Sequence, residues 1–234
     1  GANAINMYID RDIDKLMVRT QNRPLVTGAL TPRAAMIFAI ALEFVAFLVL
    51  WAGANLLAAV LAVSATLFYV FVYSLWLKRT SKQNIVIGGA AGAMPVLVGW
   101  AAVTNSLGWA PVVLFVVIFL WTPPHFWALA IRHADDYKAA GVPMMPVVVS
   151  LERTVRSMTT YAVLLTLSTL VLVPVAELGW IYGITALVFG VAFVIGSVRL
   201  GSDPSPKRSM RLFTFSITYV TAVFVALTVD VLLR

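Results

Sequence analysis

The fold class is decided by the stretch WAPVVLFVVIFLWTPPHFWALAIR, residues 109–132, in which the first charged side chain is Arg132. A helix of this length crosses the hydrocarbon core of a bilayer, which is about 30 Å thick. Six further apolar runs are long enough to cross: residues 33–53, 55–77, 85–104, 155–176, 178–200 and 209–233. The apolar start of the chain ends at Asp10, too soon to span, and we interpret it as the end of a cut helix. The sequence therefore predicts an all-α, polytopic transmembrane helical bundle, N-terminally truncated, with about seven complete spans plus a partial one.

Composition and charge agree with a membrane protein. Of the 234 residues, 61% are hydrophobic and 12% are charged, and the mean hydropathy is +0.94. These values exclude a soluble globular domain and a disordered chain, and the absence of Cys excludes a conventional disulfide-stapled secreted domain. We expect residues 1–234 to form a single membrane domain.

The basic residues predict the orientation of the spans. All but Arg234 of the 17 Lys and Arg residues fall in the alternate connections, at residues 11–33, 78–82, 132–156 and 199–211. Lys and Arg favour the cytoplasmic side of a membrane. The net charge of +7 is therefore interpreted as a topology signal, and no nucleic-acid partner is expected.

Three oxygen-bearing side chains follow one another on the first helix. Asn6, Asp10 and Asp14 are spaced four residues apart, which places them on one helix face along about 12 Å. Because carboxylates are disfavoured at a helix C-terminus, a charged helix end is a weaker interpretation than a site for Mg²⁺ and a diphosphate. Arg19 and Arg23 follow, and they are interpreted as phosphate ligands or as interfacial anchors.

The second group of candidate residues lies in residues 121–146. His125 is seven residues before Arg132, which places an ionisable side chain about 10 Å inside the interface. The preceding prolines remove backbone donors, so a cavity is expected beside them. His133 and Asp136 follow at the helix end; Arg132 stands four residues before Asp136, where a second acid would complete another metal site.

Two motifs resemble a known family. The segment NMYIDRDID (6–14), followed by Arg19-Thr20 and Arg23-Pro24, resembles the first aspartate-rich motif of the UbiA superfamily of intramembrane prenyltransferases. The segments WTPPHFW (121–127) and KAAGVPMMP (138–146) resemble its haem farnesyltransferase branch. The resemblance covers essentially the whole chain and implies nine spans in the parent protein.

The resemblance also implies a reaction. A farnesyl group would pass from farnesyl diphosphate to the vinyl group of haem B, and water would add, giving haem O and diphosphate. The expected catalytic residues are Asp10, Asp14 and His125, and the expected Mg²⁺ ligands are Asn6, Asp10, Asp14 and Asp136. The expected diphosphate ligands are Asn6, Arg19, Arg23, Lys78 and Arg79, and the expected haem or prenyl contacts are Tyr73, Trp121, His125, Phe126, Trp127 and His133. His125 would either contact the haem iron or act as a base.

Other functions and partners remain open at this point. Another UbiA-type enzyme would prenylate an aromatic acid, a quinone precursor or chlorophyllide with the same diphosphate site. A secondary transporter would use Glu43 and His125, although the charged residues gather at one membrane face. The expected location is the bacterial cytoplasmic membrane with the active face cytoplasmic, or the mitochondrial inner membrane. A downstream haem A synthase is a further candidate partner.

Overall fold

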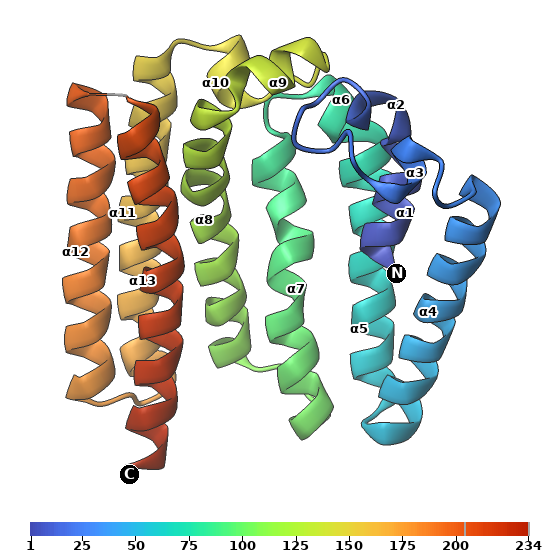
Figure 1. Cartoon of the computed structure of the whole chain (residues 1–234). Helices are drawn as coiled ribbons and strands as arrows, with labels where there is room; N and C mark the ends of the chain where they lie inside the picture. The colour runs from blue at the N-terminus through green and yellow to red at the C-terminus, as the bar shows by residue number, and fades with distance from the viewer. Residues whose placement is uncertain (204, 234) are drawn as a thin grey trace.

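The computed structural model describes residues 1–203 and 205–233, and within this part the chain is all-helical. Seven helical segments are long and apolar enough to cross a membrane, as predicted. They are α4 (Pro32–Gly53), the continuous segment Leu56–Thr80, α7 (Asn84–Thr104), α8 (Trp109–Arg132), α11 (Leu151–Val175), α12 (Trp180–Ser202) and α13 (Pro206–Leu232). A shorter helix, α1 (Ala2–Ile9), packs against α4 (Figure 1).

The segment Leu56–Thr80 is not a uniform α-helix. It begins as α5 (Leu56–Leu67), continues as the π-helix η1 (Phe68–Leu77) and ends as α6 (Lys78–Thr80). π-helical turns are rare and often occur at functional sites. Here the π-helix carries the tyrosines and the serine that face the candidate site, and it leads directly into Lys78 and Arg79.

One end of the bundle gathers the short helices and the basic connections (Figure 1). It holds α2 (Arg11–Asp14), α3 (Pro24–Thr27), α6, α9 (Ala134–Ala139) and α10 (Met145–Val148). The C-terminal end of α12 and the N-terminal end of α13 lie at the same end of the bundle. We call this end the basic face, because the alternate connections with the Lys and Arg residues meet there.

Local sequence signals explain where several spans begin. The Thr31 hydroxyl caps α4 by accepting a hydrogen bond from Ala34 N at 3.2 Å, and the Asn55 side chain caps α5 by accepting one from Ala58 N at 2.9 Å. Pro32 and Pro206 occupy first-turn positions, where the missing N–H costs no helical bond. The span boundaries predicted from the apolar runs agree with the observed ones to within a few residues.

The largest core cluster lies in the C-terminal half of the bundle. α8, α11, α12 and α13 pack together around aromatic side chains that are almost completely buried, namely Trp127, Tyr182, Phe193 and Tyr219. α7 joins this half to α5 and η1, and α1 lies against η1 and α4. The helices that face the candidate site are therefore α1, η1, α7 and α8.

Candidate active site

The polar side chains of α1 and α2 form a buried row. Asp10 interrupts the helix, but Asp10 N donates to Asn6 O at 2.9 Å and Asp14 N donates to Asp10 O at 2.8 Å. These bonds keep the predicted four-residue register across the junction. Asn6, Asp10 and Asp14 are all buried, and the Asp10 side chain is 0% exposed. Such burial of carboxylates requires compensating partners.

Each member of the row has a partner from another part of the chain. Ser74 Oγ donates to Asn6 Oδ1 at 3.0 Å, and Arg23 Nη1 donates to Asp14 Oδ2 at 2.6 Å. Lys78 Nζ forms an ion pair with Asp10 Oδ2. Lys78 and Arg23, both predicted to bind diphosphate, therefore contact the acids directly in this structure.

Asp12 lies on the solvent side of the same turn. Arg79 binds it through two hydrogen bonds of 2.7 Å, and the Asp12 side chain is 60% exposed. The hydrogen bond from Arg79 lowers the pKa of Asp12 to about 2. Burial raises the pKa of Asp10, although the ion pair with Lys78 opposes this effect.

The loop after α9 closes over this region. Ile13 and Met17 pack in one cluster with Tyr137, Val142 and Met144. The Arg19 guanidinium interacts with the Tyr137 phenol and opposes the effect of burial, which raises the pKa of Tyr137. The two motifs, which are more than a hundred residues apart in sequence, are therefore in contact at the basic face.

A cavity of about 510 Å³ lies between α1, the α5–η1 segment, α7 and α8. Its volume lies within the range of small-molecule sites, about 300–1,000 Å³. Its surface is mostly apolar, and its aromatic lining comes from Tyr69, Tyr73, Trp121 and Phe126. Tyr73 also interacts electrostatically with Asp10 and Arg19, so the aromatic wall adjoins the acidic row.

Small residues of α7 shape this cavity. A Cβ atom at Gly88 would collide with the Tyr73 ring, and one at Gly89 would lie 3.0 Å from Thr122 Cγ2. Gly92 has open space instead, and with Pro95 it lines the cavity. The glycines of α7 therefore serve two purposes, because two admit neighbouring side chains and a third leaves room for a ligand.

His125 is held beside the cavity by α13. Its ring stacks between Trp121, with centroids 4.1 Å apart, and Phe213, at 4.4 Å. Its Nδ1 lies 2.6 Å from Ser216 Oγ, and Ser216 Oγ donates its single proton to Phe213 O at 2.6 Å. With its proton on the Phe213 carbonyl, the hydroxyl accepts a hydrogen bond from the Nδ1–H of His125, and the lone pair of the neutral imidazole is then on Nε2.

The remaining predicted residues lie apart from the cavity lining. Trp127 is buried in the C-terminal core, where it meets the Tyr161 ring edge-on at 5.6 Å. His133 Nδ1 lies 3.7 Å from Asp136 Oδ2, and the two side chains are 30% and 19% exposed. Glu43 Oε2 accepts a hydrogen bond from Thr66 Oγ1 at 3.0 Å, which joins α4 to α5.

The acidic row has the donor chemistry of a magnesium site. Asn6, Asp10 and Asp14 offer the hard oxygen atoms that Mg²⁺ prefers. Within the described part of the chain, Asp10 Oδ1 is buried and accepts no hydrogen bond, and its nearest cation in the ion pairs of that part is Arg79, with Nη2 3.8 Å away. This oxygen therefore has a lone pair that a metal ion could use. In that same part, no three Asp, Glu or His side chains converge as a complete metal cage. The row therefore fits a metal that takes its other ligands from substrate phosphates and water.

Several residues of the site were not identified from sequence. Ser74 and Tyr69 lie on the π-helix. Tyr137 interacts with Arg19, and Ser216 contacts the ring of His125. Ser216 is 91 residues from His125 and Ser74 is 68 residues from Asn6. Neither serine belongs to a local motif, so only the packing of the helices places them in the site.

Comparisons with known proteins agree with this architecture. Residues 1–224 match the model of the UbiA prenyltransferase family. A protoheme IX farnesyltransferase of Gloeobacter violaceus is 53% identical over 231 residues, which cover 98% of this chain and 76% of that protein. A structure described as digeranylgeranylglyceryl phosphate synthase superposes with a TM-score of 0.79 at 20% identity, covering 98% of this chain and 80% of that one.

A third relative was solved with ligands. It is a UbiA homolog from Archaeoglobus fulgidus bound to DMAPP and Mg²⁺, with a TM-score of 0.65, 19% identity, and coverage of 97% of this chain and 83% of that one. The seven spans and the family match make this chain an integral, multi-pass membrane prenyltransferase. On the match over residues 1–224 and the close sequence similarity to a curated relative, the chain belongs to the UbiA prenyltransferase family.

Proposed function

We propose that this chain transfers the farnesyl group of farnesyl diphosphate to a vinyl group of haem B, with addition of water, to give haem O and diphosphate. The observation that carries the proposal is that an apolar aromatic cavity lies next to the buried acidic row: Tyr73 lines the cavity, and the adjacent Ser74 donates a hydrogen bond to Asn6. Such an arrangement suits a substrate with a charged diphosphate and a long hydrocarbon tail. The choice of farnesyl and haem rests on the name of the Gloeobacter relative and on the resemblance of residues 121–146 to the haem branch.

The acidic row would hold the metal. Asn6, Asp10 and Asp14 are the proposed Mg²⁺ ligands, and Asp136 is a further candidate from the second motif. A bound Mg²⁺ would neutralise diphosphate oxygens and so make the diphosphate a better leaving group. The buried Asp10 Oδ1, which accepts no hydrogen bond, and the structure of the archaeal homolog with DMAPP and Mg²⁺ support this assignment.

The cations beside the row would bind the diphosphate. Lys78 pairs with Asp10 and Arg23 with Asp14. Arg79 binds the neighbouring Asp12, and Arg19 interacts with Tyr137. As the bond between the allylic carbon and oxygen breaks, its electron pair leaves with the diphosphate. Fixed positive groups stabilise that developing negative charge more strongly than water does.

The cavity would host the carbon chemistry. The apolar walls exclude water from the allylic cation, and the faces of Tyr73, Trp121 and Phe126 are suited to stabilise it. The π electrons of the haem vinyl group then form the new carbon–carbon bond. The cation left beside the macrocycle takes up water, which must lose a proton.

His125 is the proposed proton acceptor. Its Nδ1 is engaged by Ser216, so Nε2 is the nitrogen that accepts a proton or contacts the haem iron. The stack of His125 on Trp121, a residue of the cavity wall, places the ring next to the proposed reaction space. The basic face, with its acids and cations, would face the cytoplasm in a bacterial membrane.

The test is an assay of membranes containing the protein. They would be incubated with Mg²⁺, farnesyl diphosphate and haem B, and the pigment analysed by mass spectrometry. A product heavier by one farnesyl group plus water, which disappears when Mg²⁺ is chelated, is expected. If haem stays unchanged while an aromatic acid or a quinone precursor is prenylated, the assignment to haem is wrong and the family activity stands.

A further inference from the structure

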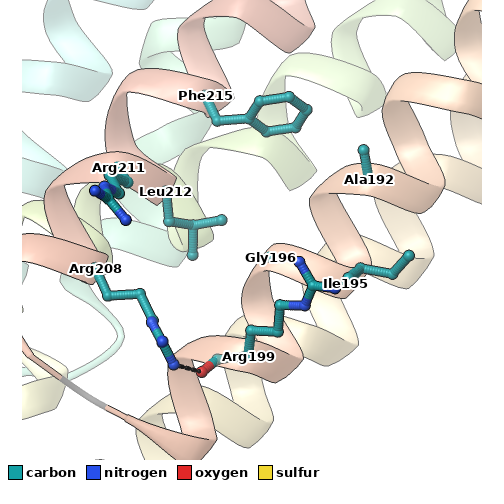
Figure 2. A pocket seen from close by; sticks show the side chains of 8 residues that line it. All are labelled: Ala192, Ile195, Gly196, Arg199, Arg208, Arg211, Leu212 and Phe215. Carbon is teal, nitrogen blue, oxygen red and sulfur yellow. Dashed lines mark hydrogen bonds between the residues drawn. The ribbon is translucent and has the colours of Figure 1, made fainter.

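A second pocket lies between α12 and α13 and opens at the basic face (Figure 2). Its volume is about 510 Å³, and none of the proposed catalytic or diphosphate residues lines it. Three arginines line its mouth, namely Arg199, Arg208 and Arg211. We refer to this pocket as the arginine groove.

The arginine groove carries an excess of positive charge. Arg208 Nη1 donates to Arg199 O at 3.0 Å, and Arg208 Nη2 lies 3.2 Å from Asp203 Oδ2. Asp203 is the one carboxylate that pairs with these guanidinium groups in the described part of the chain, and both members of the pair are largely exposed. Three guanidinium groups against one carboxylate leave the mouth of the groove suited to an anion.

The deeper part of the arginine groove is apolar. Ala192 precedes Arg199 by seven residues, and Phe215 follows Arg208 by seven, which places both about 10 Å farther into the membrane. Figure 2 shows the Phe215 side chain projecting from α13 above the arginines, with Ala192 and Ile195 on the facing helix α12. The groove is therefore charged where the headgroups lie and apolar where the acyl chains lie.

We propose that the arginine groove binds an anionic phospholipid from the membrane leaflet at the basic face. The arginines would hold its phosphate, since a guanidinium group binds phosphate oxygens in a bidentate manner. One acyl chain would lie along Ala192, Ile195 and Phe215. Basic pockets between transmembrane helices are typical sites for such headgroups. A free inorganic anion would leave the apolar part uncovered, and a zwitterionic lipid would add a cation to a groove already positive.

The first test compares two triple variants with equal changes in charge. Purified protein in detergent would be titrated with dioleoyl phosphatidylglycerol or dioleoyl phosphatidylcholine, and bound lipid counted by native mass spectrometry. Replacing Arg199, Arg208 and Arg211 by Gln should weaken binding of phosphatidylglycerol by about a hundredfold. The control replaces three exposed arginines elsewhere at the basic face, Arg33, Arg153 and Arg156, and should leave binding unchanged. Equal losses in both variants would mean general electrostatic attraction and would overturn the proposal.

The second test leaves every charge in place. Ala192→Trp would fill the apolar part of the groove, whereas Val191→Trp adds the same ring at a neighbouring exposed position outside the lining. Loss of phosphatidylglycerol binding only in Ala192→Trp is expected. Unchanged binding in Ala192→Trp, or displacement of the lipid by millimolar inorganic phosphate alone, would show that acyl contacts do not contribute and would overturn the proposal.

Discussion

Two acidic segments lie at the basic face, and they differ in what surrounds their carboxylates. At the end of α1, Asp10 and Asp14 are 0% and 4% exposed, and each is paired with a cation. After α8, Asp135 and Asp136 lie in the first turn of α9. Asp135 is exposed; the Asp136 side chain is 19% exposed, and its ion-pair partner in the described part of the chain is His133. The first segment is a preassembled buried network, whereas the second is an open one.

The difference shows why similar acids take different roles. A carboxylate at a helix C-terminus faces the negative end of the dipole, and burial adds a desolvation cost. The first segment meets both costs with Lys78 and Arg23, so its geometry is fixed before substrate arrives. The second segment carries smaller costs, because Asp135 is exposed, Asp136 is partly exposed, and the first turn of α9 is a position where the helix dipole favours carboxylates. We therefore expect the chemistry to depend strongly on the first segment and weakly on the second.

The largest effect is expected from Asp10→Asn. The change preserves the shape of the side chain but removes the charge that Lys78 pairs with and that would hold Mg²⁺. Loss of such a transition-state electrostatic contact typically reduces kcat by about a hundredfold to a thousandfold. Haem O formation in membranes, measured by mass spectrometry, checks this expectation. Near-normal turnover in a variant that purifies as a folded protein would contradict the metal assignment.

A smaller effect is expected from a change to Ser216, the side chain of α13 that holds His125 of α8. Ser216→Ala removes the acceptor that holds His125 Nδ1, so the neutral ring is free to change its tautomer. We expect kcat with haem to fall by about tenfold, at the lower limit of general acid–base contributions, with KM for farnesyl diphosphate unchanged. Ser216→Thr keeps the hydroxyl and should restore activity. Equal losses in both variants would indicate that Ser216 only supports packing.

His125→Ala gives a matched comparison with Ser216→Ala. It should impair the reaction with haem more than Ser216→Ala does, because it removes the ring itself, yet leave binding of farnesyl diphosphate intact. Titration with a non-reactive farnesyl diphosphate analogue measures that binding. If affinity for the analogue falls as much as turnover does, His125 has a structural role and the assignment as a base or iron contact is wrong.

The second acidic segment should tolerate neutralisation better. Asp136→Asn removes a partly exposed carboxylate whose partner in the structure is His133, at 3.7 Å. The long separation makes this a weak ion pair, of about 0–1 kcal/mol, so activity should fall no more than about fivefold. Steady-state kinetics at several Mg²⁺ concentrations test this. A loss as large as that of Asp10→Asn would show that Asp136 completes the metal site when substrate is bound.

Sequence predicted the fold well because the membrane imposes simple rules. The seven spans follow from apolar length, which the thickness of the bilayer core requires. The spacing of Asn6, Asp10 and Asp14 predicted their common face, since helical periodicity is local. The prediction that the connections carrying Lys and Arg share one side is also confirmed, because they lie at one end of the bundle.

The partners within the site could not be predicted in the same way. The pairing of Lys78 with Asp10 depends on the packing of η1 against α1. That packing could not be predicted, because no local sequence pattern indicates a π-helix of ten residues. The hydroxyl of Ser216 on α13 contacts His125 on α8, although the two residues are 91 positions apart in sequence. Trp127 is a case in which a motif suggested too much. It belongs to the segment that resembles the haem branch, and it was expected to contact haem or the prenyl chain, yet it lies in the core and does not line the cavity.

The smallest effect should come from Asp12→Asn, which makes the same chemical change two residues from Asp10. Asp12 is 60% exposed and pairs with Arg79 at the surface, where ion pairs contribute about 0.2–1 kcal/mol before screening by salt. We expect turnover to stay within about twofold and the thermal midpoint to fall only slightly, with the shift shrinking at high salt. The two Asn variants differ in burial and in the partner of the carboxylate, so assaying them side by side isolates those features. If Asp12→Asn inactivates the enzyme as Asp10→Asn does, both carboxylates are needed for activity, and the difference in their burial does not predict their roles.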